Sequence, residues 1–348
     1  MPVNPISNAT LTSVGQSWVQ TNGSVYGITS VPVCRALDRR SGRLSTTYEL
    51  PALDNSLNNA NGLVDWEPGQ ALPVERGLAS SSISFTPRGV MTPILARPTG
   101  RDLRQQFRDL EVNIVPVVMT GLLGGMERDL YSFLSTGGNW GGVQAFSNGA
   151  GGAATSAVDQ FGGDAVQPDQ DINVALRPLR KYQSLNGMAL EAYTNSHVLD
   201  VLSRHPAYTG AGTGSAIASK LPMDAFVQRF MAVHRLTALH VMDSVVDTTA
   251  AGIASDPNFT ANGLLWFGLI DRRGEMDLRT DGSLDAPDGA LICASGREAE
   301  VASWITPGME TESFAGRASY QIYSPRGSAF GVLMKPSGVD GIFATLPS

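Results

Sequence analysis

One run of apolar residues constrains the fold of this chain more than any other feature. Large apolar side chains recur every three or four residues over about 30 positions, which is the spacing of one buried helix face. They are Leu103, Phe107, Leu110, Ile114, Val118, Leu122, Met126, Leu130 and Phe133. Thr99 or Asp102 can cap the start of this predicted helix, and Gly137 with Gly138 ends it. Pro116 removes a backbone donor and clashes with the preceding turn, so we expect it to kink or divide the helix.

Two predicted strands and a long polar excursion precede this helix. Residues 43–53 (RLSTTYELPAL) predict a strand because Thr and Tyr suit a pleated surface, and residues 77–95 contain a returning strand. Between them, residues 61–76 (NGLVDWEPGQALPVER) have almost no apolar periodicity. We therefore expect an extended two-stranded loop from about 41 to 92. Because a structureless loop of this length is unusual in a compact domain, we expect it to lie on a neighbouring molecule.

The first 34 residues contain no charged side chain. Their apolar residues are too sparse to form a core, so they predict an extended arm that can dock onto another surface. These apolar residues are Leu11, Val14, Trp18, Val25 and Tyr26.

Helices and strands alternate after the long helix and a glycine-rich segment at 137–165, which is typical of a mobile surface loop. The predicted helices are 169–184, 195–205 and 222–233, and the predicted strands are 187–193, 237–246 and 263–270. The last part, 289–347, is rich in strand signals, including ASYQIYS and SAFGVLMK. The mixture predicts an α+β fold.

Composition excludes several classes of protein. Hydrophobic residues make up 42% of the 348 residues, which supports a real core, and no run of about 18 apolar residues predicts a membrane span. The N-terminus lacks the pattern of a signal peptide. The two cysteines, Cys34 and Cys293, make no disulfide framework, so we expect synthesis in a reducing cytoplasm.

The cationic residues are unusual, because lysine occurs only at Lys181, Lys220 and Lys335 and the other 22 of the 25 are arginines. Arginine pairs with carboxylates in a defined geometry, whereas lysine mostly solvates a surface. This bias suits charges that lie in interfaces, and a GC-rich genome explains it equally well.

No catalytic or nucleotide-binding motif is present. The chain lacks a G-x-S-x-G elbow, an HExxH or HxH pair and a phosphate loop that ends in Gly-Lys-Ser/Thr. It also lacks a basic patch with aromatic residues between the cations, which disfavours binding to nucleic acid through a basic arm. Asp65 and Glu67 flank Trp66, as in some sugar sites, but at this spacing in a loop they favour partners for arginines. We expect no enzymatic activity, no cofactor and no metal.

The order of these parts resembles the major capsid proteins of tailed bacteriophages, whose Hong Kong 97-type fold is also seen in encapsulins. Three stretches carry the resemblance: residues 26–50 (YGITSVPVCRALDRRSGRLSTTYEL), residues 100–135 with the long helix, and the helix–strand–helix of residues 168–206. The resemblance implies five regions. They are an N-terminal arm (1–40), an extension loop (41–92), a peripheral domain with a spine helix (93–175), an axial domain (176–315) and C-terminal strands that return to the peripheral domain (316–348).

The resemblance also implies a function. Many copies would form hexamers and pentamers in an icosahedral shell that encloses double-stranded DNA without sequence-specific contacts. We then expect the chain in a virion capsid, assembled in the host cytoplasm, with a portal and possible decoration or cement proteins as partners. Because the chain begins without a charged helical segment, we expect a separate scaffolding protein. Residues 1–180 contain no lysine, so we expect no isopeptide crosslink of the kind that some family members form.

The predicted contacts between subunits lie in the arm and the extension loop. They are Trp18, Arg43, Tyr48, Asp65, Trp66, Glu67, Glu75 and Arg76. We expect Trp66 to pack against a neighbour and the three acidic residues to meet arginines.

Two alternatives stay open on the sequence. An encapsulin-like compartment would load a protein cargo and assemble without a scaffold. An enzyme with a split site would use His234 and His240 with a carboxylate such as Asp243 or Asp271, although histidines with structural partners are the commoner case.

Overall fold

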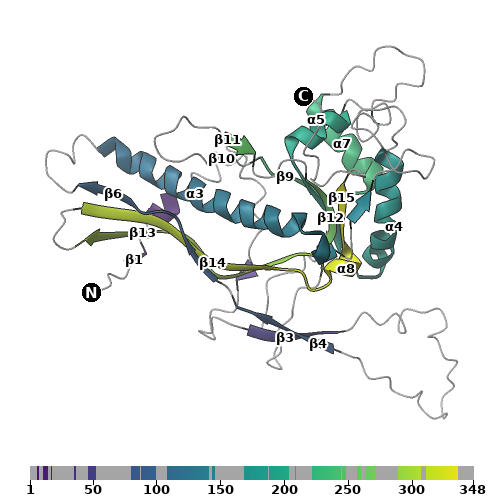
Figure 1. Cartoon of the computed structure of the whole chain (residues 1–348), viewed down its shortest axis with the longest axis horizontal. Helices are drawn as coiled ribbons and strands as arrows, with labels where there is room; N and C mark the ends of the chain where they lie inside the picture. Colours follow the sequence, from purple (N-terminus) through teal and green to yellow (C-terminus); the bar gives the residue numbers. More distant parts are fainter. Residues whose placement is uncertain are drawn as a thin grey trace, which may run out of the picture.

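The helix α3 (Arg108–Ser135) is the longest helix of the computed structural model and lies along a long β-hairpin (Figure 1). The hairpin consists of β13 (Ile292–Thr306) and β14 (Thr311–Tyr323), which pair antiparallel. The structure describes residues 6–7, 11–14, 17, 35–36, 46–51, 80–86, 88–98, 108–140, 143–145, 168–186, 188–203, 208, 222–243, 245–247, 257–259, 264–270, 289–306 and 311–335.

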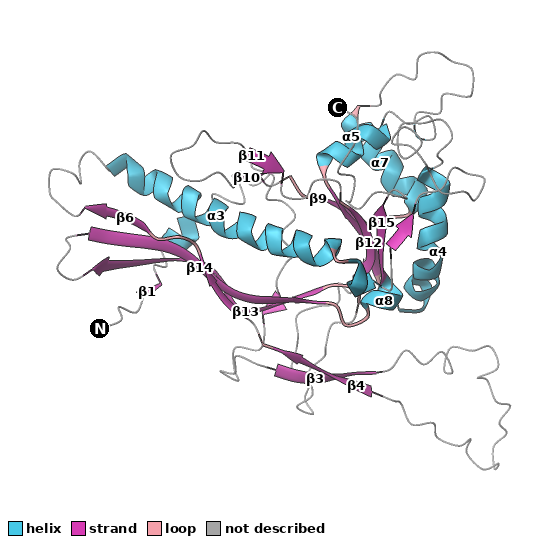
Figure 2. Ribbon diagram, viewed as in Figure 1, coloured by secondary structure: helices cyan, strands magenta, loops and turns pink. Residues whose placement is uncertain are grey.

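Short strands extend the hairpin into a six-stranded sheet. On the β14 side it continues with β5 (Arg88–Met91) and β6 (Leu95–Pro98). On the β13 side it continues with β1 (Ile6–Ser7) and β2 (Arg35–Ala36). The sheet and α3 together form an elongated layer (Figure 2).

Apolar residues of α3 bury one face of this sheet. Val115, Val118 and Met119 pack with Val301 of β13, and Leu122, Leu123 and Met126 pack with Ala318 and Tyr320 of β14. The helix lies close to the sheet at Gly316, where an added Cβ would lie 2.9 Å from Val118 Cγ1. The predicted apolar stripe is therefore the buried face wherever its side chains are described.

A compact body adjoins one end of this layer. Its five-stranded sheet has the order β7 (Val143–Ala145), β15 (Gly331–Lys335), β12 (Leu265–Ile270), β8 (Ala189–Thr194) and β9 (Ala238–Val241). Its helices are α4 (Pro168–Asn186), α5 (Ser196–Ser203), α7 (Met223–His234), α8 (Gly327–Phe330) and the 3-10 turn η4 (Gly137–Trp140). Trp266 lies at the centre, edge-on to Trp140 at 5.0 Å and to Tyr193 at 5.6 Å between ring centroids. Leu130 and Leu134 of α3 reach this same core and so join the layer to the body.

Two further pairs of strands form small sheets of their own. β3 (Thr46–Pro51) pairs with β4 (Ser80–Phe85), and β10 (Val245–Asp247) pairs with β11 (Pro257–Phe259). In the described part of the chain, no helix is long and apolar enough to cross a membrane.

The structure confirms most of the predicted elements and corrects four of them. The glycine-rich segment 137–165 is not a loop throughout, because it contains η4, whose Trp140 lies in the core of the body, and the strand β7. Pro116 does not divide α3, which continues through it. The predicted strand 237–246 is two strands in different sheets, β9 and β10. SAFGVLMK begins with the helical turn α8 before β15. The turn occurs there because Phe330 packs against Tyr182, and because Gly327 lies against the backbone of Asn139, where an added Cβ would clash.

One strand crosses a predicted region boundary and another pairs outside its assigned region, although the regions themselves stay predictions. β14 runs through the boundary at 315/316, and β15 beyond it belongs to the sheet of the body. β5, assigned to the extension loop, pairs with β14 in the layer. The predicted arm docks partly within its own chain, since β1 pairs with β13.

The close approach at Gly316 can be tested with a matched pair of glycines on adjacent strands. In Gly316→Ala the new methyl group would meet Val118, Leu122 and Thr92 at 2.9–3.3 Å. We expect the free energy of unfolding to fall by about 1–3 kcal/mol, because overpacking a close helix–sheet contact displaces the helix. Gly89→Ala on β5 meets nothing within 4 Å and is expected to change it by less than about 0.5 kcal/mol. Equal effects in urea denaturation would contradict the packing.

Candidate functional site

The β3–β4 hairpin projects from the rest of the molecule (Figure 1). Among the described strands, β3 and β4 pair only with each other. Tyr48 lies in β3 opposite Ile83, so the sequence correctly places it on this ribbon. The other predicted contact residues lie outside the described residues: Trp18, Arg43, Asp65, Trp66, Glu67, Glu75 and Arg76. Their roles stay predictions.

A cluster of polar side chains fastens the hairpin where it leaves the layer. Asp129 of α3 accepts a hydrogen bond from the hydroxyl of Tyr320 on β14 at 2.7 Å, and it forms an ion pair with Arg88 at the start of β5. We call Arg88, Asp129 and Tyr320 the root cluster. Beside it, the backbone N–H of Thr86 donates to Gln321 Oε1 at 2.6 Å. Two elements of the layer, α3 and β14, therefore contact the first residues after β4.

Tyr320 and Arg88 both keep the protons with which they bind Asp129. Burial, followed by the hydrogen bond to Asp129, raises the pKa of the Tyr320 hydroxyl, which therefore remains a donor over the whole physiological range. The hydrogen bond and the charge of Asp129 raise the pKa of the Arg88 guanidinium, which remains charged. The root cluster thus joins a carboxyl group to two permanent donors.

An open cleft of about 560 Å³ lies beside the root cluster. Thr86, Arg88 and Gln321 line one part of it, and the rest is lined by residues from the end of α3 and the turn after it. These are Ser132, Phe133, Thr136 and Asn139.

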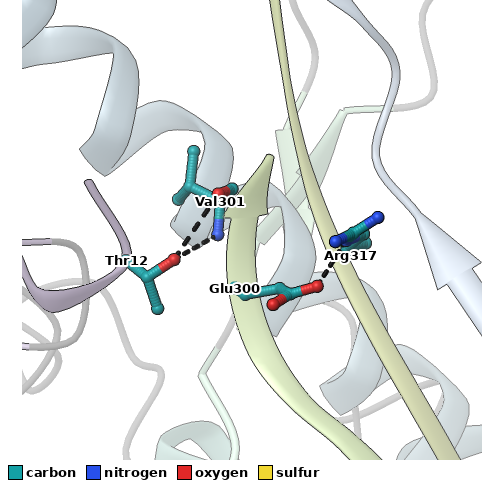
Figure 3. A network of polar contacts seen from close by, with 4 residues as sticks. All are labelled: Thr12, Glu300, Val301 and Arg317. Carbon is teal, nitrogen blue, oxygen red and sulfur yellow. Dashed lines mark hydrogen bonds and ion pairs between the residues drawn. The ribbon is translucent and has the colours of Figure 1, made fainter. Parts of the chain in front are cut away.

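The N-terminal segment is held on the other edge of the layer, along β13 (Figure 3). The hydroxyl of Thr12 accepts a hydrogen bond from the N–H of Val301 at 2.9 Å and donates to its carbonyl at 3.5 Å. Leu11 packs onto the apolar cluster beneath α3. Next to this contact, Glu300 and Arg317 form an ion pair that joins β13 to β14.

The two histidines of the split-site hypothesis have different partners. His234 is fully buried, where its Nε2 accepts from the hydroxyl of Tyr208 at 2.9 Å and its Nδ1 lies 3.3 Å from Asn173 Oδ1. His240 contacts the buried carboxylate of Glu191 at 2.7 Å and stacks on Tyr193. Asp243 accepts from the backbone N–H of Ser196, and Asp271 lies outside the described residues. Each described member therefore serves a structural contact, and His234 is closed to a substrate.

The described residues contain no group of three or more side chains that could hold a metal ion. The root cluster was not among the residues that the sequence singled out. Its members are 41 and 191 positions apart, and no motif connects them.

The environment of His234 predicts a specific dependence of stability on pH. Burial, followed by the charge of Arg180, lowers its pKa from 6.5 to about 3. Folding therefore keeps the ring neutral, and its contribution to stability is complete above pH 6.5 and is lost as the pH falls toward 3. Between pH 7 and 5 we expect a loss of about 2 kcal/mol from this group.

Urea denaturation at pH 7 and pH 5 measures this loss in the free energy of unfolding. In His234→Gln the loss should be absent, whatever the stability of this variant at pH 7. His240→Gln, whose ring is partly exposed, should keep it. The same pH dependence in His234→Gln and the unmodified chain would contradict the assignment.

No model of a known protein family matches the sequence, and no curated protein matches it. Among solved structures, the chain is similar to a phage-related protein from Bordetella bronchiseptica RB50, with a TM-score of 0.57 and 12% identity over 97% of this chain and 99% of that one. It is more distantly similar to a virus-like particle from Pyrococcus furiosus (TM-score 0.47, 10% identity, 94% and 98% coverage). The mature capsid of bacteriophage PhiM1 scores 0.45 at 9% identity, with 85% and 82% coverage.

The first of these likenesses alone is close enough to establish a shared fold, and at 12% identity it establishes no more than the fold. The α+β class that the sequence predicts is confirmed by the mixture of helices and strands, and the chain shares its fold with this phage-related protein.

Proposed function

We propose that this chain is a major capsid protein, the structural subunit of an icosahedral shell of the tailed-phage type. Many copies assemble as hexamers and pentamers and enclose double-stranded DNA in a virion, and no residue catalyses a reaction. The fold shared with a phage-related protein supports the proposal.

The observation that carries it is the isolated β3–β4 hairpin. Six residue pairs hold the two strands together, and they form a sheet of their own among the described strands. A two-stranded ribbon alone is marginally stable in water, so a second molecule that covers it would supply the missing apolar contact. The 28 residues between Pro51 and Ser80 connect the two strands and include Trp66. A neighbouring copy is the natural partner for such a ribbon, because a shell must join each subunit to several others.

Exposed apolar residues on the edge of the layer support contacts with further copies. Met91, Ile94 and Leu95 are 52%, 53% and 36% exposed and lie on or between β5 and β6. An edge strand that shows several large apolar side chains to water favours association with another chain.

The contacts between copies are non-covalent in this proposal, because the first 180 residues contain no lysine for an isopeptide bond. Boiling assembled particles in detergent should therefore release a single species of 36.8 kDa. A ladder of crosslinked species under reducing conditions would contradict this prediction. A scaffolding protein, a decoration protein and a portal stay predictions.

The proposal can be tested by sizing and electron microscopy of the purified chain, expressed alone and with the neighbouring genes. Closed particles of uniform diameter that package DNA in the complete system would support it. Particles that instead enclose a protein cargo, formed by the chain alone, would favour the encapsulin-like compartment. A chain that stays monomeric under all conditions would overturn the shell proposal.

Two tryptophan substitutions separate assembly from folding. Trp66→Ala should reduce the yield of particles at least about tenfold while the melting temperature of the free subunit changes little, because its partner surface belongs to another copy. Trp140→Ala should destabilise the subunit itself by about 3–5 kcal/mol, since Trp140 is buried between Phe133 and Trp266. Calorimetry and particle yield measured together distinguish the two effects. A loss of subunit stability in Trp66→Ala as large as in Trp140→Ala would refute the interface role.

A further inference from the structure

The direction of the β3–β4 hairpin is decided within a very short stretch of chain. β4 ends at Phe85 and β5 begins at Arg88, so only Thr86 and Pro87 lie between the ribbon and the sheet of the layer. A small change in backbone angles there would swing the whole ribbon, since a hinge needs only a few residues at the end of an element.

Polar contacts fasten this stretch on both sides of Pro87. Before it, the N–H of Thr86 is bound to the side chain of Gln321 on β14. After it, Arg88 is bound to Asp129 on α3, and Asp129 is in turn oriented by the hydroxyl of Tyr320. The ring of Tyr320 is buried against Leu122, Leu123 and Met126. The root cluster is therefore anchored to the apolar core of the layer.

The two side chains that flank Pro87, Thr86 and Arg88, are exposed. The cleft of about 560 Å³ opens next to Thr86 and Arg88, and the Arg88 side chain is 67% exposed. Space is therefore present for the hinge to move, and directed hydrogen bonds and charge define its angle.

We propose that Arg88, Asp129 and Tyr320 are positioning residues that set the angle at which the β3–β4 hairpin leaves the layer, and that breaking the root cluster releases the hairpin to other orientations. This inference rests on the proposed function for its purpose. Identical subunits of a large shell occupy non-equivalent positions, so each copy must present its hairpin to a neighbour at a slightly different angle. The root cluster gives one preferred angle that neighbours can adjust without disturbing either core.

The angle can be measured on the unassembled subunit by pulsed electron paramagnetic resonance. Spin labels are attached at Ser82→Cys on β4 and Gln228→Cys on the exposed side of α7, in a background where Cys34 and Cys293 are serine. We expect one narrow distance distribution in this parent and a distribution at least about twice as wide in Asp129→Asn and Tyr320→Phe. Asp129→Glu, which keeps the charge, should restore most of the narrow distribution.

A matched control is the ion pair between Glu300 and Arg317, which joins the strands of the same layer away from the hinge. Arg317→Gln should leave the distance distribution unchanged. Melting temperatures are recorded for every variant, because a merely structural role would lower stability without widening the distribution. Distributions in Asp129→Asn and Tyr320→Phe that match the parent, or that widen equally in Arg317→Gln, would overturn the proposal. Tyr320→Phe keeps the buried ring, so it serves as the test should Asp129→Asn fail to fold.

Particle formation by the same variants separates this inference from the proposed function. If the parent forms particles, we expect root-cluster variants to give a broader range of diameters than Arg317→Gln, and equal ranges would overturn the role of the cluster in assembly. If the parent forms no particles, the proposed function fails, and the distance distributions still decide whether the cluster sets the hairpin angle.

Discussion

The packing of α3 against β14 is the interaction on which the rest of the structure depends. Three alternate residues of β14 face the helix, and they increase in size along the strand: Gly316, Ala318 and Tyr320. The helix therefore lies close to the sheet at Gly316 and has room for a large ring four residues later. Because close-packed interfaces of this kind tolerate little change in volume, the layer behaves as one rigid unit. Leu130 and Leu134 then carry the same helix into the core of the body, which fixes the two parts to each other.

The largest of these three residues, Tyr320, positions the root cluster. Tyr320 is large enough for its ring to fill the space under α3 while its hydroxyl reaches Asp129 at the edge of the interface. The carboxylate that receives this hydrogen bond is the one that holds Arg88, and Arg88 begins the strand next to the hairpin. The proposed control of the hairpin angle thus depends on the packing of α3 against β14. The N-terminal segment is tied to the same layer through Thr12 and Val301, on the opposite edge of the sheet.

Local patterns predicted those parts of the fold that local patterns control. The spacing from Ile114 to Phe133 predicted α3 and its buried side, and the polar ribbon was recognised because its strands flank a segment without apolar periodicity. Contacts between distant positions had no such signal. Asp129 and Tyr320 look like an ordinary surface acid and a strand tyrosine, and only the fold brings them together across 191 positions. Gly316 likewise reads as a break in a strand until the helix above it is known. The predicted interface residues depend on a second molecule, so one chain leaves them as predictions.

The helix–sheet interface and the root cluster differ in how much free energy they contribute, so they can serve different purposes. Opening the helix–sheet interface would expose several fully buried side chains, each of which contributes roughly 1.5–3 kcal/mol. Arg88 and Asp129 are 67% and 35% exposed, and ion pairs with such access to water contribute about 0–1 kcal/mol. Contacts with a neighbouring subunit can therefore outweigh the root cluster but not the core. In the proposed shell, a subunit built in this way would keep its shape in every position while its hairpin adapted to the position that it occupied.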